Sequence, residues 1–147
     1  MININSLQIN VVAVLVATVV TFILGMLWYM RTFAKPWMKA MDFDPNMRPG
    51  GKTMAKGIAL SVIGNFLFSW VLAFYFAGWR LPPGGPTQFG ALAFGLNSAL
   101  SVWLGFFLPV HLMRVVWEKH SWKLFLINSG YHLTATALVS LIIAYSV

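Results

Sequence analysis

Four polar residues recur at every fourth position in the last apolar stretch of the chain: Asn128, His132, Thr136 and Ser140. In a helix this spacing places them on one face, which drifts by only about 40° at each step. Histidine alone among them can donate, accept and change charge near neutral pH. Binding or proton chemistry in this stretch should therefore centre on His132.

The three other apolar stretches carry small or polar stripes of their own, which comprise Thr18, Thr21 and Gly25, then Ser61, Asn65 and Ser69, then Asn97, Ser101 and Gly105. Polar groups in lipid need partners, and small residues let helices approach closely, so the stripes should face one another. A rise of about 1.5 Å per residue puts one polar residue of each stretch in a common layer, roughly 12 to 14 Å from the inner boundary. These residues are Thr18, Asn65, Ser101 and His132.

This layer has two main interpretations. The favoured one is interhelical hydrogen bonding, which averages only about 0.6 kcal/mol per bond in membranes but fixes the rotation and register of the helices. The other is a binding site for a small molecule or an ion. Its candidate lining residues are His132, Asn65, Asn97, Ser101, Tyr131, Asn128 and Thr18. An error in the helix boundaries would separate these residues, which is the third possibility.

No metal site and no cofactor are predicted. The chain has no cysteine. His111 follows Pro109 near the inner end of the third stretch, so it should lie roughly 10 Å shallower than His132. Histidines at such different depths cannot hold one metal ion or haem between them. The central part of every apolar stretch also lacks Asp, Glu, Lys and Arg, which argues against proton-coupled transport.

The elements that must position these residues are long apolar helices. The chain has 147 residues, of which 59% are hydrophobic and 9% charged, whereas about a quarter are charged in soluble domains. Residues 7–29, 57–79, 89–112 and 124–145 each reach the length of about 20 residues that crosses a bilayer. They show no alternation of apolar and polar residues, which argues against a barrel. We predict one all-α membrane domain over residues 1–147, a four-transmembrane-helix antiparallel bundle.

The charges predict the orientation of this bundle. Of its 10 Lys and Arg residues, only Arg80 lies in the second connection, and the others lie in or beside the first and third connections. Because Lys and Arg in short loops stay on the cytoplasmic side, both termini should face the periplasm or exterior of a bacterial inner membrane. The net charge of +7 is thereby explained without a nucleic-acid partner. The second connection, rich in Pro and Gly, should form a tight outer turn.

Aromatic residues mark the inner interface. In "FAKPWMKAMDF" we predict a short interfacial helix with Pro36 at its first position. Basic side chains there would attract anionic lipids by about 1 kcal/mol per charge. The residues assigned to this interface are Trp28, Tyr29, Trp37, Lys39 and Trp117.

Three motifs carry a resemblance to a known family. "LGMLWYMRTFAKPWMKAM", "WLGFFLP" and "WKLFLINSGYHL" occur in this order along nearly the whole chain, which resembles the bacterial family called domain of unknown function 1761. The resemblance implies a small multi-span membrane protein and brings no established activity. It directs attention to Trp28, Tyr29, Trp37, Asn128, Gly130, Tyr131 and His132. Met30 and Arg31 stand where the family pattern often has Gly-Pro.

Three functions fit these features. The first is a noncatalytic module, either a homo-oligomer or an accessory subunit of a membrane complex, because four short helices bury little surface alone. The second is a channel or carrier for a small solute with a polar site near His132. The third is a lipid-binding protein or membrane enzyme that acts at the cytoplasmic interface. Binding or assembly is favoured over catalysis, because no arrangement of nucleophile, base and orienting group can be assembled from the sequence.

Overall fold

The computed structural model describes residues 9–44, 46, 49–79 and 90–146. Arg48, Arg80 and the predicted outer turn of residues 80–88 lie outside the described residues. Every regular element in the described part of the chain is helical. In chain order these elements are α1 (Val11–Leu27), η2 (Trp28–Thr32), α2 (Ala34–Ala40), α3 (Gly51–Trp79), α4 (Gly90–Val102), η4 (Trp103–Phe107), α5 (Leu108–Trp117) and α6 (Trp122–Ser146).

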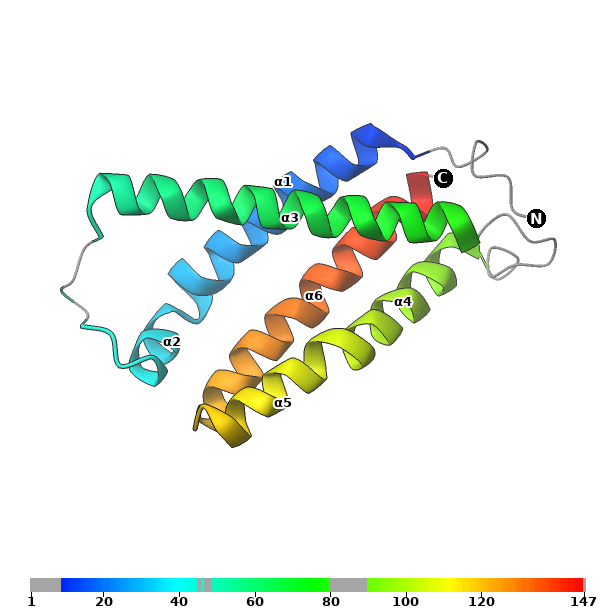
Figure 1. The fold of residues 1–147 in the computed structure, drawn as a ribbon. Helices are drawn as coiled ribbons and strands as arrows, with labels where there is room; N and C mark the ends of the chain where they lie inside the picture. Colours follow the sequence, from blue (N-terminus) through cyan, green and yellow to red (C-terminus); the bar gives the residue numbers. More distant parts are fainter. Residues whose placement is uncertain (1–8, 45, 47–48, 80–89, 147) are drawn as a thin grey trace.

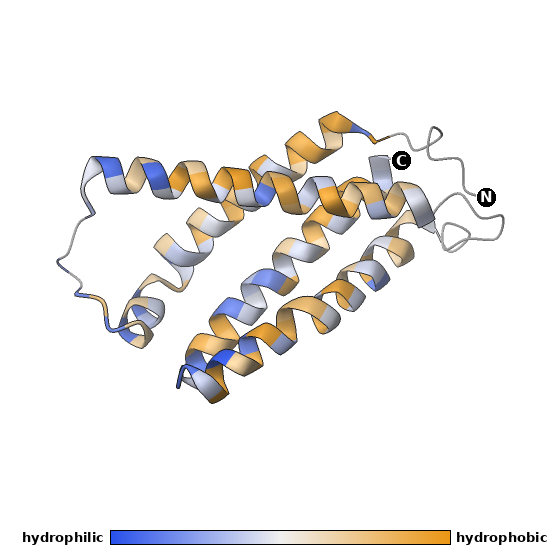
Figure 2. Ribbon diagram, in the orientation of Figure 1, coloured by the Kyte–Doolittle hydropathy of each residue, from blue (hydrophilic) through white to orange (hydrophobic). Residues whose placement is uncertain are grey.

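The predicted four-span architecture is confirmed. Four helical segments are long and apolar enough to cross a membrane: Val11–Thr32, Gly51–Trp79, Gly90–Trp117 and Trp122–Ser146. The π-helical turns η2 and η4 lie within the first and third of these segments. The second and third helices extend past the predicted inner boundaries, whereas the hydropathy pattern marks only their apolar parts. Hydrophilic residues gather at α2, at the start of α3 and at the turn between α5 and α6 (Figure 2).

The predicted interfacial helix is α2, but its start differs from the prediction. The helix begins at Ala34, so Pro36 is its third residue rather than its first. The first N–H groups of a helix have no intrahelical partner, so a proline within the first turn costs no hydrogen bond.

The bundle is closed at the end where α1 begins and α6 ends (Figure 1). Here α6 packs against α1 and α4, and α1 packs against α3. The core at this end contains Val14, Ala17, Leu72, Ala73, Phe76, Phe94, Val139, Ile143 and Ala144. The rings of Phe76 and Phe94 lie 4.6 Å apart and join α3 to α4. The side chain of Asn10 caps α1 and also donates to the carbonyl of Ser146, at 3.2 Å, so the start of α1 meets the end of α6 here.

Gly95 permits the close approach of α4 to α6. A Cβ atom at this position would lie 3.0 Å from Leu141 Cδ2 and 3.3 Å from both Leu141 Cα and Ala144 Cβ. We therefore expect Gly95→Leu to separate the helices and to lower the free energy of unfolding by about 1–3 kcal/mol. Reversible unfolding in mixed micelles would measure the change. Gly105→Leu is the matched control, because no atom lies within 4 Å of a Cβ there; equal losses in the two variants would contradict this role of Gly95.

The opposite end of the bundle is open. Every residue of α3 from 51 to 64 is exposed, and its buried residues begin only at Ser69. In Figure 1 the N-terminal half of α3 diverges from α1 and α6 toward the end that carries α2. The packing of α3 against its neighbours thus involves its second half, which begins near Asn65. A gap opens between α1, α3 and α6.

Candidate functional site

Two tryptophans hold the segment 127–132 of α6 between the neighbouring helices. The Trp28 indole N–H donates to the carbonyl of Ile127 at 3.1 Å, and the Trp103 indole N–H donates to the carbonyl of Ser129 at 2.9 Å. Trp28 comes from the first span and Trp103 from the third. The absence of a side chain at Gly130 leaves room for Trp28, whose ring would lie 3.4 Å from a Cβ at that position. These contacts fix the position of α6 relative to two neighbouring helices.

Two tyrosines add further contacts between the first span and α6. The Tyr29 hydroxyl donates to Asn128 Oδ1 at 3.1 Å. The Tyr131 hydroxyl donates to the Thr21 carbonyl at 3.5 Å, and the Tyr29 and Tyr131 rings lie 5.1 Å apart. Gly25 admits the Tyr131 ring, because a Cβ there would lie 3.2 Å from the phenol oxygen. The polar groups of Asn128 and Tyr131 are thus held by α1 and η2.

Two histidines meet beside this cluster. His111 Nε2 lies 3.1 Å from His132 Nδ1, and the same Nδ1 lies 2.8 Å from the backbone carbonyl oxygen of Asn128. The ring of Phe107 stacks on His132 with centroids 4.6 Å apart. His111 is buried and His132 is half-buried. The pair therefore joins α5 to α6.

The predicted depth offset of roughly 10 Å between these histidines is wrong. His111 lies six residues before the end of α5, and His132 lies ten residues after the start of α6, so their Cα atoms differ in depth by only about 6 Å. Side chains also lean toward the N-terminus of their own helix. Because α5 and α6 are antiparallel, the two side chains lean toward each other. Depth therefore gives no argument against a shared ligand, although no third His, Cys, Asp or Glu joins the pair within the described residues.

Four of the aromatic rings around segment 127–132 come from the two π-helical turns. Trp28 and Tyr29 belong to η2, and Trp103 and Phe107 belong to η4. A π-helical turn adds one residue to the helical repeat and so rotates the side chains around it. Such turns are rare and occur often at functional sites. Together the two turns bring aromatic rings from the first and third spans to the segment around His132.

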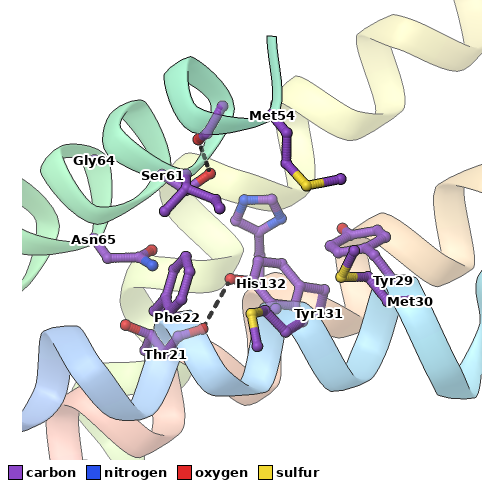
Figure 3. Close-up of a pocket in the computed structure, with 14 residues that line it drawn as sticks. Thr21, Phe22, Tyr29, Met30, Met54, Ser61, Gly64, Asn65, Tyr131 and His132 are labelled. Atoms are coloured by element: carbon purple, nitrogen blue, oxygen red, sulfur yellow. Dashed lines mark hydrogen bonds between the residues drawn. The ribbon is translucent and has the colours of Figure 1, made fainter. Parts of the chain in front are cut away.

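A groove lies between α1, α3 and α6 next to this cluster. It has a volume of about 570 Å³, and a deeper recess of about 270 Å³ adjoins it through shared lining residues. Phe22, Met26, Met30, Met54 and Ile58 contribute apolar walls. Figure 3 shows side chains of α1, α3 and α6 turned toward one space. Both the groove and the recess are lined by Thr21, Gly64, Asn65, Tyr131 and His132.

A family model described as "Protein of unknown function (DUF1761)" matches residues 12–144. The chain belongs to the DUF1761 family. Comparison with curated proteins and with solved structures gives no match. The three motifs that resemble this family meet at one place in the structure, because η2, η4 and segment 127–132 all contribute to the cluster around His132.

The structure of this DUF1761 protein brings together some of the predicted site residues. His132, Asn65 and Tyr131 line the groove, and Asn128 contacts His132 and Tyr29 next to it. Thr18 is buried on α1, where its hydroxyl donates to the Val14 carbonyl. Asn97 and Ser101 are exposed on the third span, which buries the face that carries Phe94, Gly95, Ser98 and Ala99. The prediction that the polar stripe of the third span faces the other helices is therefore wrong for Asn97 and Ser101.

Sequence reasoning missed Phe107 and His111 as neighbours of His132. It placed Thr21 in the polar stripe of the first span, although not among the site residues. The assigned interfacial residues also differ from the expectation, because the polar atoms of Trp28 and Tyr29 bond to α6. Trp37 packs on Tyr29 with ring centroids 5.4 Å apart, whereas Lys39 and Trp117 are exposed.

Proposed function

We propose that this DUF1761 protein is a noncatalytic membrane module that binds one amphiphilic molecule from the bilayer. The observation that carries the proposal is the groove between α1, α3 and α6, whose volume of about 570 Å³ lies within the range of small-molecule sites. Its walls are mostly apolar, and Asn65 and His132 place polar groups in the adjoining recess. An amphiphile would match this pattern, with its head toward the recess and its chain along the walls.

The open end of the bundle supplies an entry from the lipid. Residues 51–64 of α3 are all exposed, so in the membrane the lipid itself would lie beside the groove. Met30 and Met54 line this part of the groove, and the flexible, polarizable thioether of methionine fits ligands of varied shape. The buried core at the other end of the bundle gives no support to a channel within a single chain.

The serine and threonine hydroxyl groups in the groove argue against catalysis by a nucleophile. The Ser61 hydroxyl donates to the Gly57 carbonyl at 2.8 Å, and the Thr21 hydroxyl donates to the Ala17 carbonyl at 2.8 Å. Each hydroxyl hydrogen is thus bonded to its own helix rather than to His132. A hydroxyl nucleophile requires an adjacent base that takes up this hydrogen.

The groove can be blocked by one substitution on α3. Among the described residues, no atom outside the adjoining helix backbone lies within 4 Å of a Cβ at Gly64 or at Gly78, and of these two glycines only Gly64 lines the groove. We expect wild-type protein and Gly78→Phe, purified in mild detergent, to retain an amphiphile that native mass spectrometry detects as a bound mass. Gly64→Phe should lose at least about 90% of it, because the ring occupies the site.

The matched pair of variants makes this test specific. Gly64 and Gly78 are on the same helix, so detergent exchange and nonspecific lipid binding affect both variants alike. A bound mass that is equal in all three proteins, or absent from wild-type protein after incubation with bilayer lipids, would contradict the proposal.

Self-assembly is a second candidate function. Gly57 and Ser61 have the i, i+4 spacing of small residues at which membrane helices associate, and both lie on the exposed half of α3. A helix of a second copy would then fill the groove. The same mass spectra distinguish this candidate, because wild-type protein would be dimeric and Gly64→Phe monomeric.

A further inference from the structure

The hydrogen bonds around His132 determine which of its nitrogen atoms carries hydrogen. A backbone carbonyl oxygen can only accept, so the 2.8 Å contact between His132 Nδ1 and the Asn128 carbonyl places a hydrogen on Nδ1. His111 Nε2 lies 3.1 Å from the same atom. It then accepts a second hydrogen bond from this N–H group. If His111 Nε2 donated instead, His132 Nδ1 and the Asn128 carbonyl oxygen would both be acceptors, and they would face each other at 2.8 Å.

The opposite ring nitrogen of His132 is therefore an acceptor. The three acidic residues of the chain are Asp42, Asp44 and Glu118, and all are exposed outside the four spans. No carboxylate in the described spans balances a charge on the ring, and the membrane interior favours the neutral form, which carries one N–H. With the hydrogen on Nδ1, Nε2 has an available lone pair. No hydrogen bond within the described residues occupies this atom.

The residues around the ring of His132 define a complementary ligand. His132 and Asn65 line both the groove and the recess, and Figure 3 shows them on opposite helices around the same space. None of the residues that line the groove or the recess is Asp, Glu, Lys or Arg. A hydroxyl group can donate to the histidine and accept from the Asn65 amide at the same time. An anionic head group would instead be repelled by the lone pair of Nε2.

We propose that the groove selects an amphiphile whose uncharged head carries a hydroxyl group, and that this hydroxyl donates its hydrogen to His132 Nε2. The inference rests on the proposed binding function and names the ligand class. His111 and the Asn128 carbonyl are positioning groups, since they act on the ligand only through the ring of His132. The apolar walls hold the chain of the ligand.

A pair of probes that differ only in the hydroxyl hydrogen tests this recognition. Hexadecanol can donate a hydrogen bond, whereas its methyl ether can only accept. In nanodiscs, measured by native mass spectrometry, wild-type protein should bind the alcohol roughly fivefold more tightly than the ether. In His132→Phe the ratio of the two affinities should fall to about one, because a phenyl ring cannot accept this bond.

The outcomes separate the two proposals. If both probes bind equally well to wild-type protein, and Gly64→Phe abolishes both, the hydroxyl inference is overturned and the groove remains a binding site. If Gly64→Phe leaves the binding of both probes unchanged, the proposed function itself is wrong. If His132→Phe kept the wild-type ratio of alcohol affinity to ether affinity, the inference would also be overturned.

Nitrogen-15 NMR of histidine-labelled protein tests the hydrogen position without any ligand. The chain has three histidines, and the signals lost in His132→Phe assign those of His132. We expect the His132 hydrogen on Nδ1 and an unprotonated Nε2. A hydrogen found on Nε2 would overturn the inference, even if His132→Phe folds too poorly for binding measurements.

Discussion

Replacing Trp103 with alanine is expected to lower the free energy of unfolding by about 3 kcal/mol, as truncation of a packed aromatic side chain does. The half-buried indole ring reaches from η4 to α6, where its N–H donates to the Ser129 carbonyl at 2.9 Å. Trp103→Phe keeps most of the ring and loses the hydrogen bond, so it should cost only about 1 kcal/mol. Reversible unfolding in mixed detergent micelles, followed by circular dichroism, would measure both changes.

Trp117 provides the matched control for this prediction. It lies at the end of the same span with 78% of its surface exposed, so Trp117→Ala should change the stability by less than about 0.5 kcal/mol. Equal losses from Trp103→Ala and Trp117→Ala would show that the contact with Ser129 does not hold the helices together. A loss from Trp103→Phe as large as that from Trp103→Ala would assign the whole effect to the hydrogen bond.

The architecture could be predicted because it depends on the length and composition of the apolar runs. A segment of about 20 apolar residues can adopt few structures other than a helix in a bilayer, since every backbone polar group needs a hydrogen-bond partner there. The polar stripe on α6 could also be predicted from the sequence. Thr136 and Ser140 both face the interior, as their spacing of four residues predicts. Both features are local properties of one helix.

The site could be predicted only in part, because it depends on how helices are placed against one another. The pairing of His111 with His132 needs the antiparallel lean of two side chains and the true ends of α5 and α6. Asn97 and Ser101 are exposed because α4 packs against α6 through a different face. The groove arises because the buried residues of α3 begin only at Ser69, so the first half of this helix is not packed against its neighbours. The spacing of residues within a single helix does not predict how that helix is placed against its neighbours.

The orientation of the bundle ties the groove to one side of the membrane. The start of α1 and the end of α6 meet at the closed end, where Asn10 donates to the Ser146 carbonyl. At the open end, α2, the start of α3 and the α5–α6 turn carry the cations Lys35, Lys39, Lys52, Lys56, Lys119 and Lys123. By the retention of Lys and Arg in short cytoplasmic loops, we propose that the groove opens toward the cytoplasmic leaflet.

Single cysteines would test this orientation with an all-or-none result, because the chain has no cysteine of its own. We expect a membrane-impermeant maleimide to label Ser146→Cys in intact cells and to label Glu118→Cys only after the membrane is permeabilised. Glu118 is exposed at the α5–α6 turn, and its replacement removes none of the cations that set the orientation. Labelling of Glu118→Cys alone in intact cells would reverse the bundle and place the groove in the outer leaflet. Labelling of both variants would contradict four membrane crossings, since α6 would then have both ends on one side.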